Sequence, residues 1–157
     1  MLFDDPSWLR ASAWLARGAA QPDVAIIGVP TSVGSISPSE AWRTPGRLRE
    51  VIAGFSPYDG ETGTDLTSLA VADLGDWPVT DAELDEMVAA VAGCATELPP
   101  GPRYAFVGGD NAITRPLVAG LAGAHLAETR LSAAALKRLF ACIILIAAAR
   151  AAFAAFA

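Results

Sequence analysis

Carboxyl and amide side chains follow two of the short apolar segments of the sequence. Asp73 and Asp76 lie in the stretch VADLGD, and Asp110 and Asn111 lie in the stretch VGGDN. If these stretches are parallel strands, their carboxyl ends meet at one edge of a sheet, which is where open α/β proteins bind ligands. One interpretation is an acidic cluster at that edge. The other is a set of turn acids that accept hydrogen bonds from loop and helix-start N–H groups.

The remaining candidates for chemistry have weaker support. His125 is the single histidine of the chain, and no cluster of potential ligands surrounds it in the sequence, so an ordinary helix or surface position is expected. Ser32 or Ser35 could pair with a histidine as a nucleophile, but no G-x-S-x-G elbow is present. Neither GxxxxGK[ST] nor GxGxxG occurs, so no phosphate-binding loop is predicted.

The elements that must position these residues alternate between strand and helix. The apolar spacing predicts helices over 7–17, 44–53 and from a Thr80–Glu83 capping box to residue 98, and strands over 24–29, 69–74 and 104–107. Thr44 is the expected N-cap of the second helix, with Pro45 at its first position. This alternation predicts an α/β fold with a parallel sheet and right-handed crossovers.

Composition and charge exclude several classes of protein. The chain has 157 residues, of which 53% are hydrophobic and 18% charged, so global disorder is not expected. Its 11 basic residues against 17 acidic ones argue against a nucleic-acid partner. Cys94 and Cys142 form neither a disulfide framework nor a CxxC motif, and the first residues are acidic rather than basic. A cytoplasmic protein without a secretory leader is expected.

The composition changes near residue 123. All 14 glycines and all 11 prolines lie in residues 1–123, while residues 124–157 are rich in alanine and carry a net positive charge. We therefore predict an α/β part over 1–123 and an apolar helical tail over 124–157. Residues 139–157 contain Arg150 as their only charge and would span about 28 Å as a helix, so a tail-anchored membrane protein is one alternative.

Four segments in this order resemble the ureohydrolase family of arginases, agmatinases and formimidoylglutamases. They are IIGVP at 26–30 followed by Gly34, TPGRLRE at 44–50, VADLGD at 71–76, and FVGGDNAITRP at 106–116, which is similar to the family's GGDHSIT motif. The resemblance runs from about residue 23 to residue 123. It implies a three-layer α/β/α domain with two manganese ions, whose bridging hydroxide attacks a small amidine or guanidino substrate and releases formamide or urea.

The sequence departs from that family in its metal ligands. Asn111 replaces the family's histidine ligand after GGD, either as a weaker ligand or as a loop residue that caps the next helix. The family's Asp-Ala-His-x-Asp motif and its later Asp-x-Asp pair are absent, and Glu128 is the only acid after Asp110. The resemblance therefore implies an incomplete arginase-like sheet, closest to formimidoylglutamase and agmatinase, which lacks activity alone and does not bind manganese.

Two further expectations follow from the change of composition near residue 123. The tail reads as the product of a frame change in a GC-rich gene, since the family resemblance stops where glycine and proline disappear. An incomplete sheet would also expose a strand edge and apolar surface, which favours a homo-oligomer. A non-catalytic binding module on the same fold is the second alternative to an enzyme.

Overall fold

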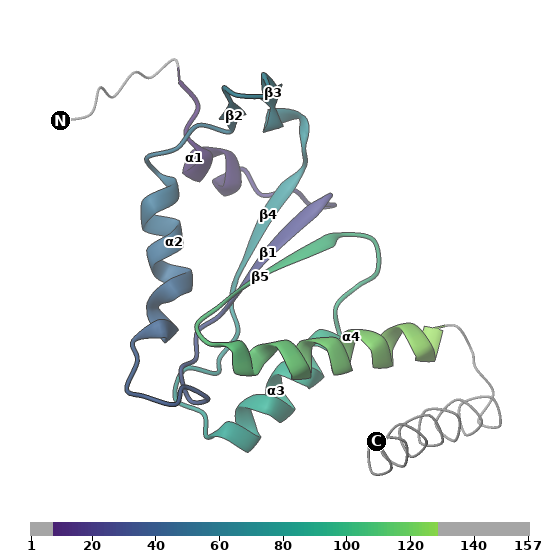
Figure 1. Cartoon of the computed structure of the whole chain (residues 1–157). Coiled ribbons are helices and arrows are strands. Elements are labelled where there is room, and N and C mark those ends of the chain that lie inside the picture. The colour runs from purple at the N-terminus through teal and green to yellow at the C-terminus, as the bar shows by residue number, and fades with distance from the viewer. Residues whose placement is uncertain (1–7, 129–157) are drawn as a thin grey trace, which may run out of the picture. The chain divides into compact units, whose positions relative to one another are not determined.

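The computed structural model describes residues 8–128 of the chain, and its centre is a parallel sheet of three strands (Figure 1). The strands are β1 (Val24–Val29), β4 (Val71–Asp76) and β5 (Arg103–Gly108), in the order β4-β1-β5. Both neighbours of β1 run parallel to it. The predicted parallel α/β sheet is therefore confirmed.

Four α-helices and several short elements connect these strands. The helices are α1 (Ala11–Ala16), α2 (Thr44–Ile52), α3 (Leu84–Thr96) and α4 (Thr114–Glu128). Single 3-10 turns occupy Ala41–Arg43, Leu66–Ser68 and Asn111–Ile113. A small antiparallel hairpin, β2 (Tyr58–Asp59) with β3 (Thr64–Asp65), was not predicted, because two exposed residues a strand leave no periodic pattern in the sequence.

The helices pack on both faces of the sheet. Ile27 and Val29 of β1 point into the main core, where they meet buried side chains of the α3 and α4 region. Gly28 points to the opposite face, because a Cβ added there would meet Pro45 of α2 at 2.8 Å. Helix α2 therefore lies on the face opposite α3 and α4 (Figure 1). This arrangement agrees with the sequence VAIIGV, which predicted a strand with apolar residues on both faces.

Two predicted helix caps are wrong. A 3-10 turn already leads into α2, so Thr44 is helical (φ −55°, ψ −44°) and Arg43 is the N-cap. Glu83, not Thr80, caps α3, and the reciprocal partner in its capping box is Glu86. Both errors have one cause: an irregular turn places the cap at a residue that is not the first Ser or Thr before the apolar stripe.

The predicted tail lies mostly outside the described residues. Helix α4 runs through the expected boundary at residue 123 and is described to Glu128. The tail over 124–157, its helical character and the 139–157 segment therefore stay predictions. Within residues 8–128, none of the helices has both the length and the hydropathy needed to cross a membrane.

Candidate functional site

The loops at the carboxyl ends of the three strands come close together because two glycines permit it. A Cβ on Gly28 would lie 1.8 Å from Asp76 Oδ1, so the carboxylate at the last residue of β4 occupies the space beside β1. A Cβ on Gly109 would lie 1.9 Å from the Thr31 carbonyl oxygen, so the loop after β5 packs on the backbone of the loop after β1. The three loops therefore meet at one edge, as the sequence predicted.

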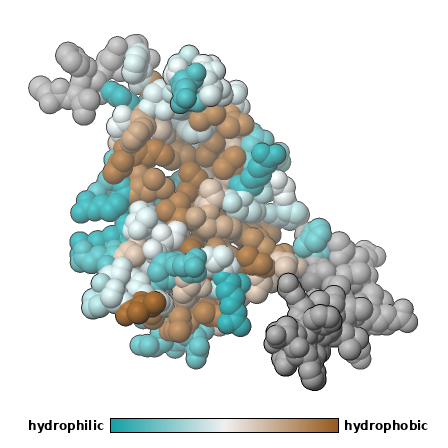
Figure 2. Space-filling model, viewed as in Figure 1, coloured by the Kyte–Doolittle hydropathy of each residue, from teal (hydrophilic) through white to brown (hydrophobic). Residues whose placement is uncertain are grey.

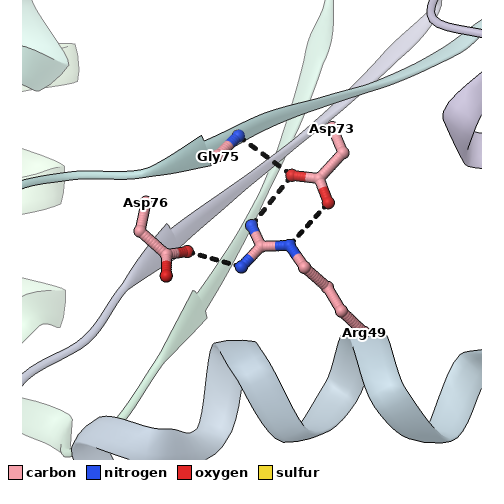
Figure 3. Close-up of polar contacts among 4 residues, drawn as sticks. All are labelled: Arg49, Asp73, Gly75 and Asp76. Atoms are coloured by element: carbon pink, nitrogen blue, oxygen red, sulfur yellow. Dashed lines mark hydrogen bonds and ion pairs between the residues drawn. The ribbon is translucent and has the colours of Figure 1, made fainter.

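At this edge Arg49 of α2 binds both carboxylates of β4, Asp73 and Asp76 (Figure 3). Its Nε and Nη2 donate to the two oxygens of Asp73 at 2.6 and 2.8 Å, and its Nη1 donates to Asp76 Oδ1 at 2.6 Å. The Gly75 N–H donates to Asp73 Oδ1 at 2.9 Å. The three charged side chains are 31%, 23% and 37% exposed, so solvent screens them only in part.

The protonation of this cluster follows from its hydrogen bonds. Donation from Arg49 lowers the pKa of the Asp73 carboxyl below its ordinary value, against an opposing effect of partial burial. The hydrogen bond to Asp73 is also the largest cause of the raised pKa of Arg49, whose guanidinium stays protonated. A bidentate guanidinium–carboxylate pair with both charges in place therefore occupies the donor atoms that a cation would need.

The third carboxylate joins two other loops. Asp110 Oδ2 accepts from the Gly34 N–H at 2.9 Å and from the Ser35 hydroxyl at 3.4 Å, and Asp110 Oδ1 accepts from the Ala112 N–H at 2.7 Å. Asp110 thereby caps the 3-10 turn before α4 and fixes the loop that follows β1. It acts as a turn acid, which was the second interpretation of the sequence.

The other candidate residues do not join this cluster. Asn111 is exposed, and its Oδ1 accepts a hydrogen bond from the Thr114 hydroxyl at 2.9 Å, while Asp110 provides the cap. Ser35 donates to Asp110 and Ser32 is half-buried in the loop after β1. His125 is exposed in the last turn of α4. None of these positions provides a site for nucleophilic catalysis on its own.

A cation does not fit the residues that the structure describes. Between residues 8 and 128, no three side chains of His, Cys, Asp or Glu come together in an arrangement that could hold a metal ion. Asp73 and Asp76 converge on one guanidinium, and Asp110 is used by backbone N–H groups and a hydroxyl. The manganese implied by the resemblance therefore lacks a ligand set here.

The role of Arg49 was missed from the sequence. Arg49 lies in the TPGRLRE segment that carries the family resemblance, but nothing in its neighbourhood identifies carboxylates 24 and 27 residues away as its partners. One signal is available in the sequence: Arg49 lies on a helix between two strands, and two acidic residues, Asp73 and Asp76, lie near the end of the second strand. That signal is weak because most arginines on helices face solvent.

A cleft of about 520 Å³ opens beside this cluster, at the carboxyl ends of β1 and β4. Its walls include Trp42, Arg43, Asp76 and Trp77. The Arg43 guanidinium lies 5.0 Å from the centre of the Trp42 ring and pairs with Glu40 at 3.2 Å. Both arginines that line the cleft therefore already have partners: Arg43 contacts an aromatic face and a carboxylate, and Arg47 pairs with Glu50.

Comparison with known proteins agrees with the fold and the motifs. Residues 22–133 match the model of the arginase family. A formimidoylglutamase of Halalkalibacterium halodurans is 31% identical over 102 residues, which cover 63% of this chain and 32% of that protein. The solved formimidoylglutamase of Bacillus subtilis is 27% identical with a TM-score of 0.67, over 79% of this chain and 40% of that one.

More distant structures share the fold. An agmatine ureohydrolase of Thermoplasma volcanium has a TM-score of 0.61 at 21% identity, over 76% of this chain and 39% of that one. A formiminoglutamase of Trypanosoma cruzi solved with Mn²⁺ has a TM-score of 0.62 at 22% identity, over 74% and 40%. The chain spans between about a third and two fifths of the length of these relatives. Since the family model matches most of its residues, the chain belongs to the arginase family.

Proposed function

We propose that this chain corresponds to the amino-terminal part of a hydrolase that cleaves C–N bonds of small amidine or guanidino compounds, on the formimidoylglutamase and agmatinase side of the family. The observation that carries the proposal is the 31% identity to a formimidoylglutamase over 102 residues, together with the GGDN loop of the sequence. The substrate class follows from the names of the relatives. A cytoplasmic location fits the free Cys94 and the absence of a disulfide framework in the sequence.

We further propose that the polypeptide has no hydrolase activity by itself. Asp73 and Asp76 at the sheet edge are already paired with Arg49. The amide oxygen of Asn111 is a neutral metal ligand at best, and it accepts a hydrogen bond from the Thr114 hydroxyl. One neutral amide oxygen does not hold a pair of divalent cations, which need several anionic or imidazole ligands. This supports a non-catalytic module with the family's fold as the second candidate function.

The first experiment measures metal and product on the purified chain. The chain is dialysed against MnCl₂, analysed for bound manganese by mass spectrometry, and then assayed for formamide from formimidoylglutamate and urea from agmatine. We expect far less than one manganese ion per chain and no product above the buffer rate, while the Bacillus subtilis formimidoylglutamase turns over in parallel. Bound manganese near one ion per chain, together with product, would refute the proposed inactivity.

The second experiment tests the family part of the proposal. Residues 22–123 replace the corresponding segment of the Halalkalibacterium halodurans formimidoylglutamase, and the chimera is assayed with formimidoylglutamate. Two versions are compared, one with Asn111 and one with Asn111→His. Measurable hydrolysis by either version supports a shared function, whereas a folded chimera that is inactive in both versions contradicts it.

A further inference from the structure

The cleft at the carboxyl ends of β1 and β4 has the size of a small-molecule site. Its volume is about 520 Å³, and its walls all come from residues 30–80, inside the part of the chain that the structure describes. Small-molecule sites are largely apolar and carry a few converging polar groups. Gly46 lines the cleft, and a Cβ added there would meet no atom within 4 Å. The cleft therefore has room for a ligand of the size of an amino acid.

Two indole rings line this cleft. The backbone N–H of Trp77 donates to the Gly28 carbonyl at 2.9 Å, and the Trp77 ring centre lies 5.6 Å from that of Phe106 at an angle of 53°. Trp42 lies in the 3-10 turn before α2, with the Arg43 guanidinium 5.0 Å from its ring centre. Rings that are already held in place lose little conformational freedom on binding, so an apolar or aromatic group can pack on them at a low cost in entropy.

Arg47 and Glu50 place a positive and a negative charge next to each other in the cleft. Arg47 contacts Glu50 through Nη1, and the edge formed by Nε and Nη2 is the one by which Arg49 of the same helix binds Asp73. A guanidinium can bind a second carboxylate through that edge, and a carboxylate can accept further hydrogen bonds at its second oxygen. Figure 2 shows hydrophilic residues on the side of the molecule on which Figure 1 draws α2. The side chains of the pair are 67% and 64% exposed, so a ligand can bind them without breaking a buried contact.

The other charged residues that line the cleft are Arg43 and Asp76. Arg43 pairs with Glu40 at 3.2 Å, and Asp76 pairs with Arg49 at 2.6 Å. Every charge in the cleft wall therefore has a partner of opposite sign. A ligand that carries both charges is complementary to such a wall, whereas a purely anionic or purely cationic ligand leaves one of the two signs unmatched.

We propose that this cleft binds a free α-amino acid with an apolar or aromatic side chain. The carboxylate and the ammonium group of such a ligand are separated by one carbon atom, so they match the adjacent guanidinium of Arg47 and carboxylate of Glu50. Its side chain packs on the indole rings of Trp42 and Trp77. This site goes beyond the proposed function, since it requires neither manganese nor a C–N bond that can be hydrolysed.

A nuclear magnetic resonance titration of the full chain tests this site with three ligands of similar shape. L-Phenylalanine carries both charged groups, phenethylamine lacks the carboxylate, and 3-phenylpropanoate lacks the ammonium group. We expect L-phenylalanine to shift the indole N–H signals of Trp42 and Trp77 until they saturate, and to leave those of Trp8 and Trp14, which do not line the cleft, unchanged. The other two ligands should bind at least tenfold more weakly.

Three outcomes of this titration overturn the proposal. They are the absence of saturable shifts with L-phenylalanine, equal shifts at all four tryptophans, and equal affinity for a ligand that lacks one of the charged groups. Because the titration involves neither metal nor turnover, its result is independent of the hydrolysis assays.

Matched substitutions test the two charged contacts. Arg47→Met removes the partner of the ligand carboxylate and Glu50→Gln that of the ammonium group, whereas Arg115→Met removes an exposed arginine of α4 that does not line the cleft. The first two should raise the dissociation constant of L-phenylalanine by about tenfold, and Arg115→Met should leave it unchanged, with native circular dichroism spectra throughout. Glu50→Gln should not weaken 3-phenylpropanoate, which has no ammonium group. Equal dissociation constants of L-phenylalanine for Arg47→Met and Arg115→Met, or a loss of both ligands in Glu50→Gln, would refute the proposal.

Discussion

At the scale of single residues, Arg49 is the side chain on which the carboxyl edge depends. Its guanidinium makes three hydrogen bonds to Asp73 and Asp76, which come from the strand beside it. Without the guanidinium, two carboxylates that are only partly exposed would repel each other, and Asp73 would keep only the Gly75 N–H of its donors described above. The bidentate geometry distinguishes this contact from the exposed Arg47–Glu50 pair of α2, which solvent screens.

Replacing Arg49 by methionine should therefore destabilise the fold. We expect Arg49→Met to lower the free energy of unfolding by about 1–3 kcal/mol, the range for groups left unpaired at a partly buried site. Arg47→Met is the matched control, because Arg47 pairs with Glu50 on the exposed surface of the same helix, and it should cost less than about 0.5 kcal/mol. Urea unfolding of both variants measures the difference, and equal losses would contradict the role assigned to Arg49.

The same pair predicts how stability depends on pH. The pKa of Asp73 is lower in the folded chain than in the unfolded chain, where it is about 3.9, so this carboxylate stabilises the fold above that pH. Its contribution is lost as the pH falls through the lower, folded-state pKa. We expect the free energy of unfolding to decline between about pH 5 and pH 2, and Asp73→Asn to flatten part of that decline.

The control for this titration is Asp81→Asn, which removes an exposed carboxyl in the turn before α3. Urea unfolding at a series of pH values should give the same acid slope for Asp81→Asn as for the unmodified chain. An unchanged slope for Asp73→Asn would show that other carboxylates carry the acid sensitivity.

The sequence predicted the position of the acidic residues better than their roles. Asp73 and Asp76 lie in β4 and Asp110 follows β5. The carboxyl ends of parallel strands share one edge, so the strand order of an α/β sheet is enough to predict that these residues lie near it. Which partner each carboxylate binds depends on contacts across 24 to 76 residues of sequence. Tertiary contacts of that kind leave no local pattern, so Arg49 and Gly34 could not be assigned as their partners.

At the scale of elements, three strands and three helices were predicted in type but not in their exact ends, and the β2–β3 hairpin was missed. Strands β1, β4 and β5 were all predicted, but β4 begins two residues later than expected because its start is set by pairing of Val71 with Val24. Helix α1 is shorter than the 7–17 pattern, and α3 stops at Thr96. Strand and helix ends are decided by neighbouring chains and by caps, which hydrophobic spacing does not record.

The packing of α3 against α4 depends on one glycine, and this gives a prediction for the two helices. A Cβ on Gly120 of α4 would lie 2.4 Å from the Ala92 carbonyl oxygen and 2.7 Å from Ala95 Cβ, so Gly120→Ala must push the helices apart. We expect a loss of about 1–3 kcal/mol in the free energy of unfolding.

Gly93 of α3 is the matched control for this pair of helices. It is exposed and has no atom within 4 Å of an added Cβ. Gly93→Ala should raise the free energy of unfolding by up to about 1 kcal/mol, because alanine has the higher helix propensity. Thermal unfolding of both variants by circular dichroism measures the effects, and a shift of the same sign in both would contradict the packing of α3 on α4.

At the scale of the molecule, hydrogen bonds within the described residues tie together the loops and helix at the carboxyl edge of the sheet. The loops after β1 and β5 are tied by Asp110 to Gly34, and α2 is tied to β4 by Arg49. Each tie uses an anionic group that a divalent cation would otherwise need. The described part of the chain therefore keeps the arginase-family fold while its carboxylates serve the stability of the fold.

Because these carboxylates are already hydrogen-bonded, we predict that manganese does not stabilise the chain. A site filled at a hundred times its dissociation constant would add about 2.7 kcal/mol to the free energy of unfolding. For a chain of this length that corresponds to a rise of roughly 5–10 °C in the midpoint of thermal unfolding. We expect 1 mM MnCl₂ to change the midpoint by less than about 1 °C, both for the unmodified chain and for Asn111→His, because Arg49 still holds Asp73 and Asp76.

The Trypanosoma cruzi formiminoglutamase, whose structure was solved with Mn²⁺, is the positive control. A rise that saturates with manganese in the unmodified chain would show that the Arg49 contacts give way to the metal, and a rise confined to Asn111→His would show that the missing imidazole was the one obstacle.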